Sequence, residues 1–250
     1  MAEPGRCGRR RRPPLVLETS PVTRLPPLAS CVLALAAIPV AVRAEIDPSK
    51  YAAPVKVACV GDSITQGHGA GGQPWPAQVG RLLGEAWEVK NYGISGTTLM
   101  NSGDSPYQKQ NAFAAAKASQ PDVVVIMLGT NDTKPQNWRN VEADYRKDYA
   151  DLVQQFAELP SKPRIFLCYP PYIAKGGNWG INERDTKAQI PLIAALAKDK
   201  GLDVIDVHAA LEGKDALIPD NVHPNAGGQA AIAGAIYTAL TGKAVDTAAQ

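Results

Sequence analysis

Residues 122–128, Asp-Val-Val-Val-Ile-Met-Leu, contain six consecutive apolar side chains after a single aspartate. A strand with one face in water alternates polar and apolar residues, whereas a strand covered on both faces does not. The run is followed directly by the polar sequence Gly129-Thr130-Asn131-Asp132. This stretch therefore predicts a central strand of a parallel sheet, with a polar loop at its carboxyl end.

Strand and helix patterns alternate on both sides of this run. Short β-rich runs predict four more strands, at 56–60, 87–92, 164–168 and 202–207. Helical spacing and helix-end signals predict helices at 74–84, 107–118, 141–159, 185–200 and 226–240. Five strands separated by helices indicate an α/β fold, a doubly wound three-layer sandwich with a five-stranded parallel sheet. We predict one such domain over residues 45–243 and a C-terminal tail at 244–250.

The first 44 residues differ in charge from the rest. They hold seven of the 26 basic residues and two of the 24 acidic ones, which leaves 19 basic and 22 acidic residues in the remainder. An arginine cluster at 9–12 precedes an uncharged, alanine-rich stretch at 25–42, and the stretch ends in Val42-Arg43-Ala44. This layout predicts a signal peptide over residues 1–44, cleaved after Ala44, and a periplasmic or secreted protein. The alternative is an N-terminal membrane anchor, which prolines in the apolar stretch disfavour.

The residues after Ala44 are mildly acidic, which argues against a nucleic-acid partner. We also expect no membrane contact once the signal is removed. Two of the four cysteines, Cys59 and Cys168, follow Ala44, and both fall in predicted strands. Buried free thiols are the favoured interpretation. A disulfide between them is the alternative in an oxidising compartment.

Residues that could take part in catalysis follow the predicted strands at their carboxyl ends, where ligands of such sheets bind. They are Ser63, Gly93, Asn131, and the pair Asp220 and His223. A serine can be activated by a histidine that takes its proton, and an aspartate can hold that histidine in the right tautomer. Amide donors can then stabilise an oxyanion. The set predicts acyl transfer.

Four blocks of the sequence, around Ser63, Gly93, Asn131 and His223, resemble the SGNH, or GDSL, hydrolase superfamily. The resemblance implies a flavodoxin-like α/β sandwich and a serine esterase that needs no metal and no cofactor. It implies Ser63 as nucleophile, His223 as base and Asp220 as the acid that orients the base. It also implies an oxyanion hole made by the backbone N–H groups of Ser63 and Gly93 and the side-chain amide of Asn131.

More narrowly, residues 88–93, 130–138 and 179–182 are similar to secreted bacterial sialate O-acetylesterases and related carbohydrate esterases. This likeness implies a short acyl group, most simply acetyl, on a carbohydrate or another small-molecule alcohol. The aromatic residues Tyr172 and Trp179, in the loop after 164–168, are candidates to contact a sugar ring. Both equally suit a structural role, because large aromatic side chains are often buried.

Other functions fit parts of the same pattern. A lysophospholipase or thioesterase would use the same three residues. A non-catalytic sugar-binding or nucleotide-binding domain is the alternative of another class, because the loop at 61–67 follows a strand as a phosphate-cradling loop does. That loop lacks the lysine and glycine spacing of such loops. His68 and His208 lack metal-ligand spacing to other candidates, so we expect them to be structural or solvated.

Overall fold

The computed structural model describes residues 45–138 and 141–245, all within one compact unit, Val42–Gln250. The predicted signal peptide, residues 1–44, lies outside the described residues, as does most of the predicted tail. Among the helices that are described, none is long and apolar enough to cross a membrane.

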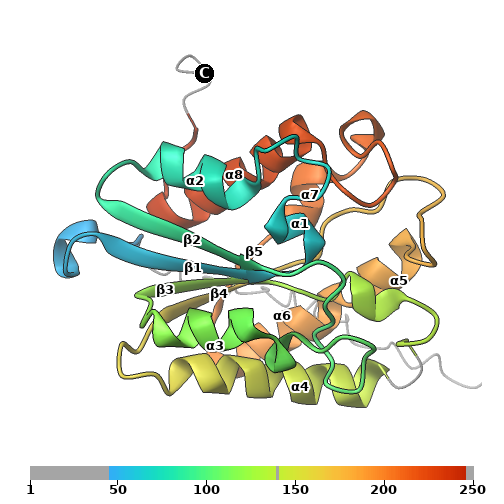
Figure 1. Ribbon diagram of the computed structural model, residues 1–250, viewed down its shortest axis with the longest axis horizontal. Coiled ribbons are helices and arrows are strands. Elements are labelled where there is room, and N and C mark those ends of the chain that lie inside the picture. The colour runs from blue at the N-terminus through green and yellow to red at the C-terminus, as the bar shows by residue number, and fades with distance from the viewer. Residues whose placement is uncertain (1–44, 139–140, 246–250) are drawn as a thin grey trace, which may run out of the picture. The chain divides into compact units, whose positions relative to one another are not determined.

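Five strands form one parallel sheet in the order β2-β1-β3-β4-β5, so the fold class predicted from the sequence is confirmed (Figure 1). The strands are β1 (Val55–Gly61), β2 (Trp87–Gly93), β3 (Val123–Met127), β4 (Arg164–Cys168) and β5 (Asp203–Ile205). The chain moves from β1 to one side for β2 and then returns to the other side for β3. The loops that follow β1 and β3 therefore diverge, and a crevice is expected at the carboxyl ends of these two strands.

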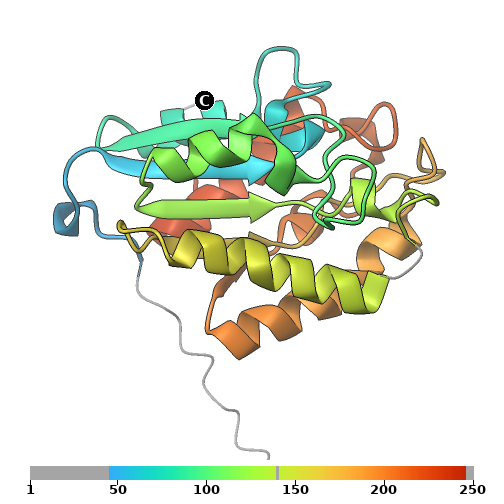
Figure 2. The ribbon, with the colours of Figure 1, turned by 60° about the horizontal axis from the view of Figure 1, so that its bottom comes forward.

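Helices cover both faces of the sheet (Figure 1). One face carries α1 (Ser63–Gln66), α2 (Trp75–Leu83), α7 (Val207–Leu211) and α8 (Ala226–Thr241). The other carries α3 (Asn111–Ala118), α4 (Val141–Ala157) and α6 (Ile190–Lys200), which lie side by side in Figure 2, with α5 (Glu183–Ala188) beyond them. The described residues also contain short 3-10 helices: η1 (Pro48–Lys50), η2 (Tyr107–Lys109), η3 (Asn131–Thr133) and η4 (Asp215–Leu217).

The two faces of β3 explain its uninterrupted apolar sequence. Val123, Val125 and Met127 join the apolar cluster beneath α2 and α8, whereas Val124 and Ile126 join the cluster beneath α3, α4 and α6. All five residues of β3 are buried. The strand is therefore the centre of two cores, one on each side of the sheet.

Two predicted helices are divided in the structure. The helix expected at 107–118 is η2 followed by α3, because Gln110 between them is extended, with φ −88° and ψ 149°. The helix expected at 185–200 is α5 followed by α6, and the break lies at Gln189. Pro191, at the start of α6, has no N–H to donate to the preceding turn, so a continuous hydrogen-bond ladder cannot form there. The strand expected at 202–207 ends at Ile205 because the next residue, Asp206, caps α7.

Cys59 and Cys168 are buried and free. They lie in β1 and β4, which are separated by β3. Strands two positions apart are about 9.6 Å apart, well beyond the Cα separation that a disulfide spans. Burial raises the pKa of both thiols well above the ordinary value. The alternative of a disulfide is therefore wrong, and the thiols are packed as small apolar groups.

Candidate active site

A hollow of about 260 Å³ lies at the carboxyl edge of the sheet. It collects residues from the loops after β1, β2, β3 and β4 and from the segment before α8. Its lining consists of Ser63, His68, Ser95, Gly96, Asn131, Lys134, Trp179, Ile181 and His223. Four of the predicted site residues, Ser63, Asn131, Trp179 and His223, thus meet in one place.

Ser63 is the first residue of α1, directly beyond β1. Asp62 caps this short helix, because its carboxylate accepts the N–H of Ile64 at 3.0 Å. Gln229 of α8 also stabilises α1, since its side-chain amide donates a hydrogen bond to the carbonyl of Ile64 at 3.1 Å. These bonds hold the serine at the floor of the hollow, where it is 8% exposed.

Ser63, His223 and Asp220 form a continuous hydrogen-bonded chain. Ser63 Oγ lies 2.9 Å from His223 Nε2, and His223 Nδ1 lies 2.8 Å from Asp220 Oδ2. The other oxygen of Asp220 accepts the backbone N–H groups of Val222 and His223 at 2.9 and 2.6 Å. One carboxylate therefore fixes both the turn that carries the histidine and the orientation of its ring.

The surroundings of this chain act on its ionisation. Burial lowers the pKa of His223, and the neighbouring His68 ring and the positive charge of Lys134 lower it further, while Asp220 acts in the opposite direction. Burial alone would raise the pKa of Asp220, but the N–H groups of His223 and Val222 outweigh it and leave that pKa below its ordinary value. At neutral pH the histidine is thus uncharged beside an ionised aspartate, the state in which an imidazole can accept a proton.

Asn131 begins η3, four residues after the end of β3, and its side chain is held in place by its neighbours. Its Nδ2 donates one hydrogen bond to the carbonyl of Thr97 at 3.0 Å, which leaves its second amide proton for another acceptor. Next to it, the buried carboxylate of Asp132 accepts the N–H groups of Leu99 and Met100, each at 2.8 Å. Asp132 therefore ties the loop after β2 to the loop after β3, although burial raises its pKa to about 6.

Gly93 is not part of the hollow, contrary to the role predicted for it. Its N–H donates to the side chain of Asn91 at 2.9 Å, and a Cβ there would meet the backbone of Gln66 at 2.3 Å. Gly96 lines the hollow instead, with φ +80°. Among the described residues, the Gly96 N–H makes no hydrogen bond. The second glycine of the sequence Gly93-Ile94-Ser95-Gly96 was therefore the better candidate.

The two predicted aromatic contacts have different positions. Trp179 stands at the rim of the hollow, 54% exposed, with its ring centroid 5.3 Å from that of His223. It is held there by Asn178, whose amide donates to the carbonyl of Asp220 at 3.1 Å. Tyr172 lies away from the hollow, and its hydroxyl donates to Asp215 at 3.0 Å. The structure thus brings Trp179, but not Tyr172, to the serine.

The two remaining histidines also differ. His208 is buried, and its Nε2 lies 2.7 Å from a carboxylate oxygen of Glu183, so the expected structural role agrees with its contacts. His68 is exposed and lines the hollow, with its ring centroid 4.3 Å from that of His223. The exposure of His68 agrees with the solvated alternative expected for it, but the lack of metal-ligand spacing in the sequence did not reveal its neighbours in space. One donor atom each from His68, Asp220 and His223 lie within 4.8 Å of one another.

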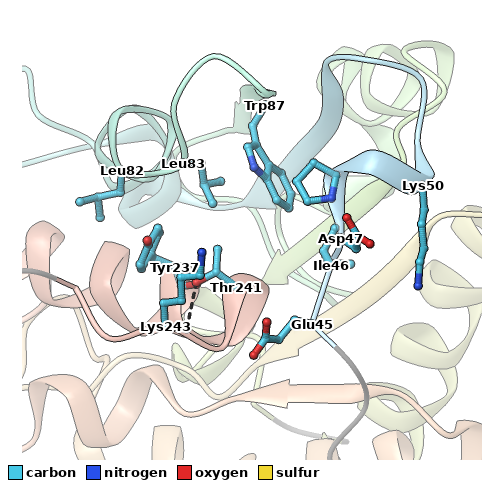
Figure 3. A pocket seen from close by; sticks show the side chains of 11 residues that line it. Glu45, Ile46, Asp47, Lys50, Leu82, Leu83, Trp87, Tyr237, Thr241 and Lys243 are labelled. Atoms are coloured by element: carbon cyan, nitrogen blue, oxygen red, sulfur yellow. Dashed lines mark hydrogen bonds between the residues drawn. The ribbon is translucent and has the colours of Figure 1, made fainter.

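A second, larger hollow of about 700 Å³ lies where the strands begin (Figure 3). Leu82 and Leu83 of α2 and Trp87 of β2 form one side, and Tyr237 and Thr241 of α8 face them. Glu45, Asp47, Lys50 and Lys243 surround the opening. This lining contains no serine, cysteine or histidine, so it holds no nucleophile and base of the kind found at the other edge.

Comparisons with known proteins identify the family of the chain. The model of the GDSL-like Lipase/Acylhydrolase family matches residues 59–231. An acetylxylan esterase from Xylanibacter ruminicola is 37% identical over 208 residues, which cover 74% of this chain. The chain spans 43% of the length of that relative.

Two solved structures have a similar fold. One is a carbohydrate acetylesterase from Sinorhizobium meliloti, with a TM-score of 0.59 and 22% identity over 73% of this chain and 96% of that one. The other is an acetylxylan esterase from Geobacillus stearothermophilus, with a TM-score of 0.60 and 23% identity over 78% of this chain and 98% of that one. At these sequence identities, the structural similarity shows a shared fold and nothing further.

Proposed function

This chain belongs to the GDSL-like lipase/acylhydrolase family, and we propose that it is a serine esterase that removes acetyl groups from carbohydrates. The observation that carries the proposal is the chain of hydrogen bonds from Ser63 through His223 to Asp220, at 2.9 and 2.8 Å. Such a chain is the requirement for nucleophilic catalysis by a hydroxyl group. A domain that only binds a sugar or nucleotide has no need of it.

In the proposed reaction, His223 Nε2 takes the proton of Ser63 as Oγ attacks the ester carbonyl. The imidazolium that forms is stabilised by Asp220. Collapse of the tetrahedral intermediate breaks the bond to the sugar oxygen, which receives the proton from His223, and leaves an acyl group on Ser63. Water, deprotonated by the same histidine, then releases acetate and restores the serine.

The negative oxygen of each tetrahedral intermediate requires donors. We assign them to the backbone N–H groups of Ser63 and Gly96 and to the second amide proton of Asn131, because all three residues line the hollow. The predicted contribution of Gly93 is dropped, since its N–H is bonded to Asn91. Donors fixed before the reaction stabilise the oxyanion without reorganisation at the moment of attack.

Two observations favour acetyl on a sugar over a long acyl chain. The hollow measures about 260 Å³, which suits a short acyl group. Trp179 at its rim offers an exposed aromatic face, the kind of surface on which a sugar ring packs. The relative from X. ruminicola carries the name acetylxylan esterase, which makes acetylated xylan the first substrate to test, ahead of acetylated sialic acid.

The location of the enzyme is also proposed from the sequence. We propose that residues 1–44 are a signal peptide and that the mature chain is exported. Determination of the N-terminal residue of the protein purified from the periplasm or medium tests this. A mature N-terminus at Glu45 supports cleavage after Ala44, whereas an intact leader in the membrane fraction supports an anchor.

The reaction is tested with a phosphonate probe and a substrate panel. We expect the probe to label Ser63 in the wild-type protein and to leave Ser63→Ala unlabelled. We expect release of acetate from acetylated xylan, and faster hydrolysis of acetyl than of octanoyl nitrophenyl esters. Labelling with a strong octanoyl preference, or activity on lysophospholipid alone, would replace the carbohydrate assignment with a lipid or thioester one. Absence of labelling would contradict an activated serine.

A further inference from the structure

A second histidine faces the proposed catalytic base across the rim of the hollow. The ring of His68 lies with its centroid 4.3 Å from that of His223, and the two ring planes make an angle of 54°. His68 is exposed, and its side chain makes no hydrogen bond or ion pair within residues 45–138 and 141–245. In its neutral form it therefore presents one nitrogen lone pair beside His223 that none of the described residues uses.

Asp220 completes a set of three donors. One donor atom each from His68, Asp220 and His223 lie within 4.8 Å of one another. Ligand nitrogens around a tetrahedral zinc ion are about 3.3 Å apart when each Zn–N bond is about 2.0 Å. Because the His68 side chain is exposed, its ring can rotate and bring a nitrogen from within 4.8 Å to the shorter separation that zinc requires. Lys134, which also lines the hollow, opposes a cation, and the carboxylate of Asp220 offsets that charge.

We propose that Zn²⁺ binds between His68 and His223, with Asp220 as a third ligand, and blocks the active site reversibly. Two imidazoles and one carboxylate suit zinc and its neighbours nickel and copper. They do not suit Mg²⁺ or Ca²⁺, which prefer oxygen ligands. Binding of the ion follows from the donors alone, whereas the block rests on the function proposed above.

The block follows from the two bonds that His223 already makes. With Asp220 as a ligand, the ion binds to Nδ1, because Asp220 lies on the Nδ1 side of the ring and Nε2 points toward Ser63. The ring proton then moves from Nδ1 to Nε2, and the hydrogen bond between His223 and Asp220 is broken. Nε2 now carries a proton in place of the lone pair that must accept the proton of Ser63, so the histidine no longer acts as a base. The ion is thus an inhibitor of this enzyme and takes no part in ester hydrolysis.

The chain has three histidines, so the experiment has a matched control. His68→Gln removes the proposed ligand, and His208→Gln removes the histidine that lies against Glu183, with circular dichroism to check the fold of each variant. The protein is used without a histidine tag. Zinc binding is measured by calorimetry, and inhibition by hydrolysis of nitrophenyl acetate relative to the uninhibited rate of each variant.

We expect one zinc ion per wild-type chain, inhibition that EDTA reverses, and no inhibition by Mg²⁺ or Ca²⁺ at the same concentration. Loss of a residue that only hydrogen-bonds to a metal ligand lowers metal affinity by about 10- to 100-fold. Loss of a ligand itself should cost at least as much, so His68→Gln should weaken both zinc binding and inhibition by about tenfold or more. His208→Gln should bind zinc as the wild type does.

Equal zinc affinity in wild type and His68→Gln would overturn the site. Binding that depends on His68 but leaves hydrolysis unchanged would overturn the block. A wild-type protein without esterase activity would refute the proposed function instead, and calorimetry would still decide whether His68 binds zinc.

Discussion

Of the two hollows described above, which lie at opposite edges of the sheet, the smaller one contains the chemistry. The hollow where the strands begin measures about 700 Å³ and is lined by the ends of α2 and α8 (Figure 3). The hollow at the carboxyl edge measures about 260 Å³ and contains Ser63, Asn131 and His223. Strand order explains the difference, because only at the carboxyl edge do the loops after β1 and β3 diverge. Position in the topology is here a better guide to function than volume.

The largest expected contrast between the two hollows comes from the nucleophile. Ser63→Ala should lower kcat by about a millionfold, the effect measured when a protease of the same catalytic type loses its serine. Tyr237→Phe, in the larger hollow, should leave kcat unchanged. Nitrophenyl acetate hydrolysis by the two purified variants measures this. Near-normal turnover by a folded Ser63→Ala protein would show that the hollow at the carboxyl edge is not the active site.

Asn131 should give the next largest effect. Removal of one oxyanion donor typically costs about 10² to 10³ in rate, so Asn131→Ala should lower kcat by that factor with little change in KM. Steady-state kinetics on one acetyl ester separates the two parameters. A change confined to KM would indicate that Asn131 binds the substrate and does not stabilise the oxyanion.

Trp179 and Tyr172 should differ by about an order of magnitude. If a sugar ring packs on Trp179, its loss removes roughly 1.4 kcal/mol of contact, and Trp179→Ala should raise KM for acetylated xylan by about tenfold. Tyr172→Phe should leave KM unchanged, because the hydroxyl it loses is bonded to Asp215 away from the serine. Equal effects of the two substitutions would argue against a sugar contact at the rim.

The smallest expected effect is on pH dependence. The base must be neutral, and burial lowers the pKa of His223, so kcat/KM should rise with a midpoint below 6.5 and then level off. The charge of Lys134 contributes to that lowering, so Lys134→Met should move the midpoint to higher pH. Lys243→Met, in the larger hollow, should not move it. The profiles are measured with EDTA present, and a midpoint above 6.5 in the wild type would contradict the assignment.

Local patterns were sufficient to predict the fold and the hydrogen-bonded chain. The run at 122–128 identified β3, and the five predicted strands are all present. Asp220 and His223 lie three residues apart, so a short turn brings the carboxylate to the ring, and the motif around Ser63 identified the other partner. The strands and the contact of Asp220 with His223 depend on neighbours in sequence, whereas the contact of Ser63 with His223 joins distant segments and was predicted from the family resemblance of the blocks around them.

Other features of the site depend on contacts between distant segments. His68 and His223 come together only because α1 and the segment before α8 share one edge of the sheet, and no spacing in the sequence indicates this. The choice between Gly93 and Gly96 required the hydrogen bond from Gly93 to Asn91. The break at Gln189 could have been anticipated from Pro191, a signal that the helical pattern around it obscured.

The two buried thiols have a consequence for measuring how the protein opens. Cys59 and Cys168 are inaccessible while β1 and β4 remain in the sheet, so an alkylating reagent can modify them only during rare excursions from the native state. When reclosing is faster than alkylation, the labelling rate reports the equilibrium between closed and open forms. Peptide mapping distinguishes these thiols from Cys7 and Cys31. Because β3 lies between them, equal rates would indicate that the sheet opens as one cooperative unit, and unequal rates that one side separates first.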